Sequence, residues 1–161
     1  MGISSCDLNW QRISKNDSMI QIIGAIDELN SYLGLIKAML SKEEIRQSDC
    51  QFIEEIQKNL MKLMSHVSDN KNEKLFFTQD IVVSLENEVI RLSENIPRLT
   101  GFVLPGKSII EAQIQVGRTI TRRAERYFAA AVNEERKLCP NAGEYLNKLS
   151  DYLFILSQQD Y

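Results

Sequence analysis

Apolar residues recur every three or four positions in five long segments, and this spacing restricts the possible folds of the chain more than any other feature. Within residues 18–40 the series is Ile22, Ile26, Leu29, Leu33, Ile36 and Leu40. Such a series places its side chains along one face of an α-helix, where other helices can bury them. We therefore predict a helix over residues 18–40 with one face in a core.

The same spacing predicts helices over residues 48–67, 78–95, 108–137 and 140–158. Pro97 stops the third of the five helices, and Pro140 suits the first turn of the last. No segment shows a convincing alternation of apolar and polar residues, so we expect residues 1–17 to form an extended lead or loop. The prediction is an all-α five-helix bundle, with residues 18–161 as one helical domain.

Composition and charge exclude several classes of function. A formal net charge of -3 gives no sign of nucleic acid or a membrane surface as a partner, and the apolar runs are too short to span a membrane. Cys6, Cys50 and Cys139 are widely spaced and form no CxxC pair, which argues against disulfides and zinc. The single histidine, His66, is predicted to be structural or solvent-facing. Without a secretory signal, we expect a cytoplasmic or organellar protein in a reducing compartment, with no metal site of its own.

Two stripes of side chains run next to each other along the predicted helix that begins at residue 108. The apolar stripe consists of Ile110, Ile114, Gly117, Thr121, Ala124 and Phe128. The polar stripe lies about 100° away around the helix, and it consists of Glu111, Gln115, Arg118, Arg122 and Glu125. Long polar side chains next to a core-facing stripe are expected at the edge of an interface.

The polar stripe has two interpretations. In the first it is a solvated charged face, whose side chains pair at three- and four-residue spacing. In the second, Arg118 and Arg122 point together at a phosphate-bearing ligand, because guanidinium groups match phosphate oxygens, and Glu111 and Glu125 hold them in place. At the start of the same helix, Ser108 and Glu111 have the spacing of a capping box.

Residues 101–108, GFVLPGKS, match the phosphate-binding pattern GxxxxGK[ST] letter for letter. A true P-loop follows a buried strand in a βαβ unit, whereas the segment before residue 101 is predicted to be a helix. The interior of the loop is also bulky and poor in N–H donors. We therefore predict that this segment is no P-loop, although the helix start behind it can attract an anion.

Five sequence blocks together resemble one family, the PduO-type ATP:corrinoid adenosyltransferases. The blocks are QRISK (11–15), GAIDELNS with LGL (24–35), FVLPG (102–106), RTITRRAER (118–126) and YLNKLSDYLF (145–154). The resemblance implies a trimeric five-helix bundle that transfers the 5′-deoxyadenosyl group of ATP to the cobalt of a reduced corrinoid and releases triphosphate. It implies ATP, Mg²⁺ and cobalamin as ligands, a homotrimer, and a corrinoid reductase or an adenosylcobalamin-dependent enzyme as candidate protein partners.

The resemblance also implies which residues bind ATP. They are Lys15, Arg122, Glu125, Arg126 and Asn147. Because the leaving triphosphate is a polyanion, Arg122 and Lys15 are expected to neutralise it together with Mg²⁺. Asn147 is expected to hydrogen-bond the nucleotide.

On the corrinoid side, the resemblance implies catalytic roles for Phe102, Asp27 and Arg118 in addition to Arg122. Phe102 matches the aromatic residue that the family places where the lower axial base of the cobalt would sit, and an apolar wedge there excludes a fifth ligand. Asp27, next to the corrinoid pocket, and Arg118 are expected to form a salt bridge across the subunit interface.

The sequence departs from the family at its beginning. Family members usually carry a Thr-Gly-Asp-x-Gly loop that wraps the ATP phosphates, whereas residues 4–10 here read SSCDLNW, in a region 1–17 that we assign to the nucleotide loop. Gln115, Lys107 and Lys148 also replace a usual His, Gly and Arg. The sequence leaves open an adenosyltransferase with a displaced gene start, or a relative that binds corrinoid or a partner through the same trimer without turnover.

Overall fold

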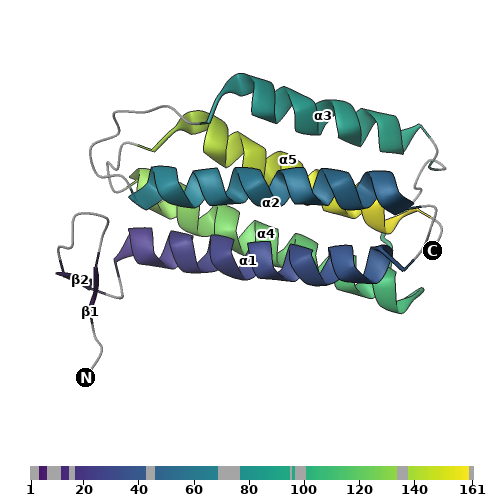
Figure 1. The fold of residues 1–161 in the computed structure, drawn as a ribbon, viewed down its shortest axis with the longest axis horizontal. Coiled ribbons are helices and arrows are strands. Elements are labelled where there is room, and N and C mark those ends of the chain that lie inside the picture. Colours follow the sequence, from purple (N-terminus) through teal and green to yellow (C-terminus); the bar gives the residue numbers. More distant parts are fainter. Residues whose placement is uncertain are drawn as a thin grey trace.

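The computed structural model describes residues 4–6, 12–14, 17–42, 46–68, 77–94, 96, 101–133 and 138–159. Its elements are, in chain order, β1 (Ser4–Cys6), β2 (Arg12–Ser14), α1 (Ser18–Leu40), α2 (Gln47–Ser68), α3 (Gln79–Ser93), α4 (Ile109–Asn133) and α5 (Pro140–Ser157). The five predicted helices are present (Figure 1), and the predicted bounds of α1 are confirmed. The predicted ends at residues 95 and 137 lie outside the described residues.

Helix α1 begins where Asp17 caps it. The Asp17 side chain accepts a hydrogen bond from the backbone N–H of Met19 at 2.9 Å, which satisfies one of the free donors of the first turn. All six apolar residues predicted from the spacing are buried, with exposed fractions of 1% or less. The apolar face of α1 therefore lies in the core, as predicted.

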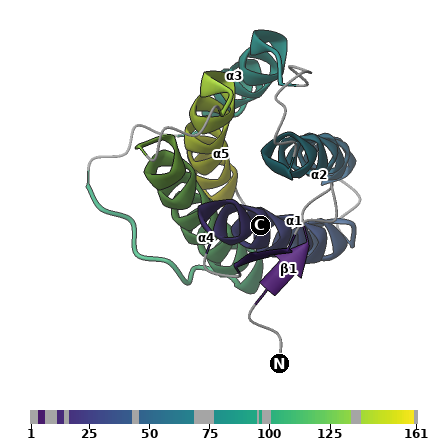
Figure 2. The same ribbon diagram turned by 90° about the vertical axis from the view of Figure 1, so that its left-hand side faces the viewer.

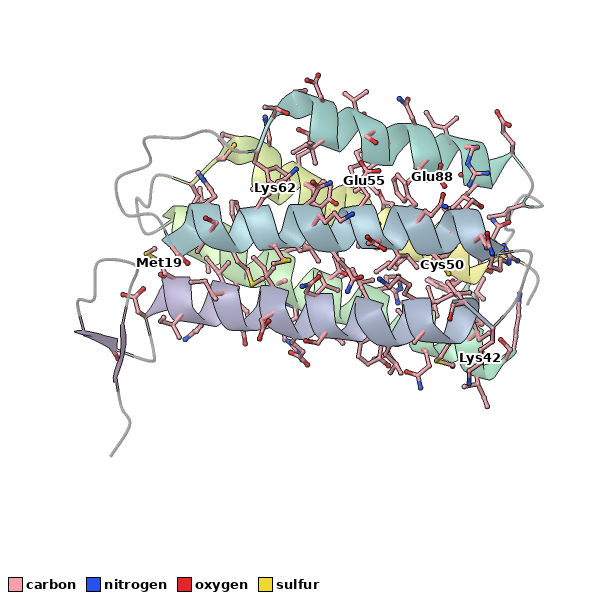
Figure 3. All side chains as sticks on the ribbon, in the orientation of Figure 1. Met19, Lys42, Cys50, Glu55, Lys62 and Glu88 are labelled. Carbon is pink, nitrogen blue, oxygen red and sulfur yellow. The ribbon has the colours of Figure 1, made fainter. Side chains whose placement is uncertain are left out.

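The helices form a bundle in which α1 packs against α2 and α4, while α5 packs against α4 and α3. Seen end-on, α3 lies at the outside next to α5 (Figure 2). Cys50 lies on the side of α2 that faces α1 (Figure 3), and its thiol contacts the carbonyl of Lys37 at 3.7 Å. The rings of Phe52 and Tyr152, 5.3 Å apart between centroids, join α2 to α5. None of the described helices has both the length and the apolar character required to cross a membrane.

His66 has the structural role predicted for it. It is 3% exposed, and its Nε2 atom accepts a hydrogen bond from the backbone N–H of Cys139 at 3.0 Å. Because Nε2 accepts, the proton of the neutral ring lies on Nδ1. His66 therefore fixes the end of α2 to the residue that precedes α5.

Residues 1–17 were expected to form an extended lead or loop, and the structure adds a short strand pair that the sequence did not predict. β1 and β2 pair in antiparallel register, with Ser4 opposite Ser14 and Cys6 opposite Arg12. Strands of three residues are too short to produce a recognisable alternation, so the pairing left no periodic signal in the sequence. The hairpin precedes α1 and lies at the end of the bundle where that helix begins (Figure 1).

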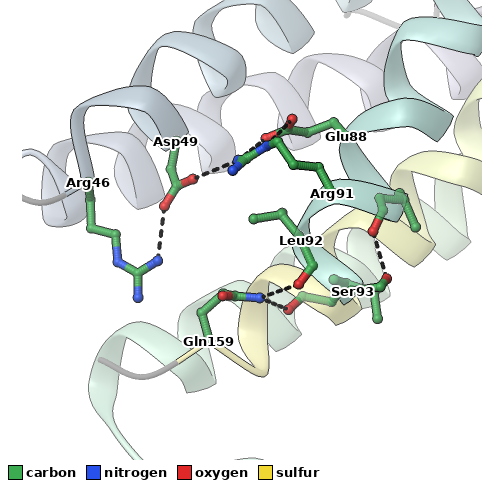
Figure 4. Close-up of polar contacts among 9 residues, drawn as sticks. Arg46, Asp49, Glu88, Arg91, Leu92, Ser93 and Gln159 are labelled. Carbon is green, nitrogen blue, oxygen red and sulfur yellow. Dashed lines mark hydrogen bonds and ion pairs between the residues drawn. The ribbon is translucent and has the colours of Figure 1, made fainter. Parts of the chain in front are cut away.

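At the opposite end of α1, a network of charged side chains joins the start of α2 to the end of α3 (Figure 4). Asp49 is 3% exposed; it lies 3.2 Å from Nη1 of Arg46 and 4.0 Å from Nη2 of Arg91. Arg91 also donates two hydrogen bonds to Glu88, at 2.8 and 2.6 Å. Gln159, after α5, donates to the carbonyl of Leu92 at 3.2 Å. Asp49 is thus a buried charge whose cost is offset by these two arginines.

We expect Asp49→Asn to lower the free energy of unfolding by roughly 1–3 kcal/mol, because it leaves Arg46 without its carboxylate; the range is reduced since Arg91 is half-exposed. Chemical denaturation measures this change. The control is Glu54→Gln, which removes the exposed ion pairs with Lys58 and Lys37 and should leave the midpoint of denaturation nearly unchanged, because exposed ion pairs are screened by solvent. Equal effects of the two substitutions would contradict a stabilising role for the Asp49 network.

Candidate active site

Packing in the core determines which way the polar stripe of α4 faces. Ile114, Thr121, Ala124 and Phe128 of the apolar stripe are at most 3% exposed, which confirms the predicted buried face. The neighbouring polar stripe lies along the edge of this face, so its residues change from buried at the start of α4 to exposed further along. Glu111 and Gln115 are 2% and 4% exposed, whereas the side chain of Arg122 is 45% exposed.

Arg122, Glu125 and Asn147 come together across the α4–α5 contact. Nη1 of Arg122 lies 2.7 Å from Oε2 of Glu125, and Nδ2 of Asn147 donates to Oε1 of the same carboxylate at 3.0 Å. One carboxylate therefore contacts both a cation on its own helix and an amide on the next helix. Arg126, one turn further along, donates to the backbone carbonyl of Arg122 at 3.1 Å.

Arg118 is held one turn earlier by a different set of contacts. Its Nε atom donates to Oε1 of Gln115 at 2.8 Å, and Nε2 of Gln115 donates to the hydroxyl of Ser157 on α5 at 2.9 Å. The buried amide thus bridges α4 and α5 and fixes the direction of Arg118. The sequence placed Gln115 in the polar stripe but gave no sign of Ser157, because a contact between helices leaves no local pattern.

The prediction that Glu111 holds the arginines is wrong. Oε2 of Glu111 instead accepts hydrogen bonds from the backbone N–H groups of Gly106 and Lys107, at 2.6 and 3.1 Å. Glu111 precedes Arg118 by seven residues, or about 10 Å along the helix, and in the first turn it lies next to free N–H groups. The capping half of the prediction is confirmed, because Ser108 Oγ accepts from the N–H of Glu111 at 3.0 Å.

Phe102 is fully exposed in the loop that leads into α4, and Leu104 is 84% exposed. The last described helix before this loop is α3, so the GxxxxGKS segment does not follow a strand in the described part of the chain. This agrees with the prediction that the segment is no P-loop. The loop instead presents two large apolar side chains to the surroundings.

Asp27 lies on the exposed side of α1, and no ion pair joins it to Arg118 within the described residues. Helices α1 and α4 run antiparallel, with Glu28 next to Arg123 and Ile36 next to Gly117. Asp27 on α1 is therefore level with approximately residue 124 on α4. Arg118 is then about 9 Å away along the axis. Its bond to Gln115 also directs it away from the level of Asp27. Lys15 lies outside the described residues.

Two further features lie away from these residues. Lys148 pairs with Glu86 of α3 at 2.7 Å, and this hydrogen bond raises the pKa of the lysine, so Lys148 faces α3. A surface cavity of about 220 Å³ lies at the same place, and none of the predicted site residues lines it.

Among the residues described, no three His, Cys, Asp or Glu side chains are grouped to hold a metal ion.

The same chain matches a family model described as cobalamin adenosyltransferase over residues 2–159. It belongs to the cobalamin adenosyltransferase family. A corrinoid adenosyltransferase from Bacillus subtilis (strain 168) is 35% identical over 146 residues, which cover 89% of this chain and 74% of that protein. One from Citrobacter freundii is 33% identical over 151 residues, covering 91% and 83%.

Solved structures of adenosyltransferases have the same fold. A variant of the PduO-type ATP:corrinoid adenosyltransferase from Lactobacillus reuteri, complexed with cobalamin and ATP, aligns with a TM-score of 0.86 at 27% identity, covering 97% of this chain and 84% of that one. A second variant of that enzyme, complexed with ATP, aligns with a TM-score of 0.87 at 27% identity and covers 97% and 87%. The resemblance inferred from the five sequence blocks is therefore confirmed.

Proposed function

We propose that this chain is an ATP:corrinoid adenosyltransferase that transfers the 5′-deoxyadenosyl group of ATP to the cobalt of a reduced corrinoid. The observation that carries the proposal is the cluster of Arg122, Glu125 and Asn147 across α4 and α5, in a chain that matches the family along nearly its whole length. The cluster offers a cation, a hydrogen-bond donor and a carboxylate at one place, which suits a nucleotide.

The proposed transfer is a nucleophilic substitution at C5′ of ATP. An external reductant first supplies one electron, which converts cobalt(II) of the corrinoid to cobalt(I). The cobalt(I) electron pair then forms the Co–C5′ bond while the C5′–O bond breaks, and the electrons of that bond leave on triphosphate. The barrier therefore depends on reaching cobalt(I) and on stabilising a departing polyanion.

Arginines of α4 are suited to stabilise the departing triphosphate. Arg122 and Arg126 lie one turn apart on the same face of α4, and Glu125 holds Arg122 while Asn147 holds Glu125. A guanidinium group held in place before the reaction needs no reorganisation as charge develops on the leaving oxygen. Lys15 is proposed as a further cation on the triphosphate.

Magnesium fits this site as part of the nucleotide. Mg²⁺ is commonly bound through phosphate oxygens with one or two carboxylates, and Glu125 is a carboxylate in contact with the proposed ATP residues. When bound, the ion neutralises charge on the phosphates. Arg122 and Arg126 then neutralise the remaining charge, and Asn147 orients the nucleotide.

Phe102 is proposed to help the corrinoid cobalt reach the cobalt(I) state. Its ring is fully exposed on a loop, so a flat corrinoid can cover it without displacing a core side chain. An apolar ring under the cobalt keeps water and an axial base away, and cobalt(II) without a fifth ligand is easier to reduce. Burial of the ring by the corrinoid also adds apolar contact area to the complex.

We propose that three copies of the chain assemble and that Asp27 of one copy pairs with Arg118 of another. On α1, Gly24, Asp27, Ser31 and Leu35 are exposed, and small residues let another helix approach closely. Next to it, α4 exposes apolar side chains, Ile109 by 73% and Val116 by 44%. Exposed apolar side chains on α4, together with small residues on α1, favour a protein interface.

The proposed activity is tested by incubating the protein with Mg-ATP and cob(II)alamin under a strong reductant. We expect the absorbance of adenosylcobalamin to develop, and Arg122→Ala to lower kcat/KM by about 100-fold because a preorganised cation is lost. Lys58→Ala, which removes an exposed cation on α2, is the control and should leave the rate unchanged.

Residues 4–10 contain no glycine, unlike the usual loop of the family, which favours a second candidate function, corrinoid binding without turnover. Corrinoid binding with no Co–C bond would support that candidate and refute transfer.

The proposed interface predicts that Asp27→Ala and Arg118→Ala each weaken the trimer. Loss of one partner leaves the other charge unpaired in the interface, which costs several kcal/mol when the pair is buried. Sedimentation velocity over a range of protein concentrations measures the change. Trimers of unchanged stability in both variants would rule out a salt bridge between subunits, and a monomeric wild-type protein would rule out the assembly itself.

A further inference from the structure

The loop that carries Phe102 has a charged anchor. Oε2 of Glu111 accepts hydrogen bonds from Gly106 and Lys107, while Oε1 of Glu111 is buried without a hydrogen-bond partner among the described residues. A carboxylate that is 2% exposed is costly to bury unless charge-assisted hydrogen bonds and a helix N-terminus compensate for it. Apart from the start of α4, the compensation comes from the two loop N–H groups, which both bond to the same oxygen.

Gly106 shapes the backbone so that it can reach this oxygen. Its φ angle is +118°, in a region that residues with a side chain rarely adopt. This conformation lets the N–H groups of two successive residues, Gly106 and Lys107, point at one acceptor. The bonds from Gly106 and Lys107 to Glu111 therefore fix the path of the loop that runs from Phe102 and Leu104 into α4.

We infer that Glu111 is a positioning residue for Phe102, acting through the backbone of the loop. This inference depends on the proposed adenosyltransferase function, in which the phenyl ring crowds the cobalt. Phe102 precedes Gly106 by four residues, so the Cα atoms of the two residues are at most about 14 Å apart. The ring itself makes no contact that shields it from solvent, being fully exposed, so its placement before ligand binding depends on the backbone of the loop.

Three variants separate the anchor from the ring. Glu111→Ala removes the acceptor, and Glu111→Gln keeps an acceptor oxygen without the charge. Gly106→Ala leaves the carboxylate in place but disfavours the positive φ; it fills open space, because a Cβ there meets no atom within 4 Å. Phe102→Ala is the reference for loss of the ring, and Glu94→Gln, an exposed carboxylate at the end of α3, is the control.

The first measurement is amide hydrogen exchange without ligand. We expect exchange at Gly106 and Lys107 to become at least about tenfold faster in Glu111→Ala, and less so in Glu111→Gln, while core amides of α1 keep their rates. Gly106→Ala should release the same amides. Unchanged exchange in all three variants would refute the anchor, whatever the activity of the protein.

The second measurement tests whether the anchor acts on the cobalt. We expect Glu111→Ala and Gly106→Ala to lower kcat by about tenfold, in the direction of Phe102→Ala, with the KM for ATP changed by less than about threefold. Glu111→Gln should restore part of kcat. The electron paramagnetic resonance spectrum of bound cob(II)alamin should show less four-coordinate cobalt in Glu111→Ala than in wild type.

The outcomes distinguish the two proposals. Released loop amides with an unchanged kcat and an unchanged cobalt(II) spectrum would overturn the positioning role and leave the adenosyltransferase standing. If wild-type protein binds cob(II)alamin but forms no Co–C bond, the proposed activity fails, and the cobalt(II) spectra of the variants still decide whether Glu111 positions Phe102. A protein that binds no corrinoid overturns both.

Discussion

Helix α4 packs between α1 and α5, and this packing determines where the polar side chains of α4 lie. Gly117 allows this packing to be close, because a Cβ at that position would lie 3.0 Å from Cδ1 of Ile36 on α1. Thr121 and Ala124 continue the small, fully buried face along α4. Since one face of the helix is fixed by the core, the direction of every other side chain on α4 is fixed with it.

Contacts from α5 then hold the polar side chains of α4 in place. Asn147 contacts the carboxylate that pairs with Arg122, and Ser157 contacts the amide that holds Arg118. Both contacts are made by side chains whose neighbours on α5 lie in the core, so they cannot shift without moving apolar residues. An arginine held in this way loses less conformational entropy when an anion binds. The contact between α4 and α5 therefore holds Arg118 and Arg122 in place before any ligand binds.

Most of the fold follows from local pattern, and part of the site does not. The periodicity of residues 18–40 predicted both the bounds and the buried face of α1, because the apolar series from Ile22 to Leu40 continues over about five turns. The hairpin formed by residues 4–6 and 12–14 was missed because three-residue strands have no detectable period. Glu111 was assigned to the wrong partner, since spacing shows which side chains share a face but not which backbone groups compete for them. The nucleotide and corrinoid roles were inferred from the resemblance of five sequence blocks, and the structure adds how Arg118, Arg122 and Glu125 are held.

In the proposed reaction, arginines of α4 hold a triphosphate that departs intact as the adenosyl group moves to cobalt. Quantifying triphosphate and adenosylcobalamin in the same reaction tests this role. We expect one triphosphate to be released for each Co–C bond formed, with no separate phosphate or ADP. Release of phosphate or ADP in proportion to the product, or nucleotide cleavage without a Co–C bond, would contradict it.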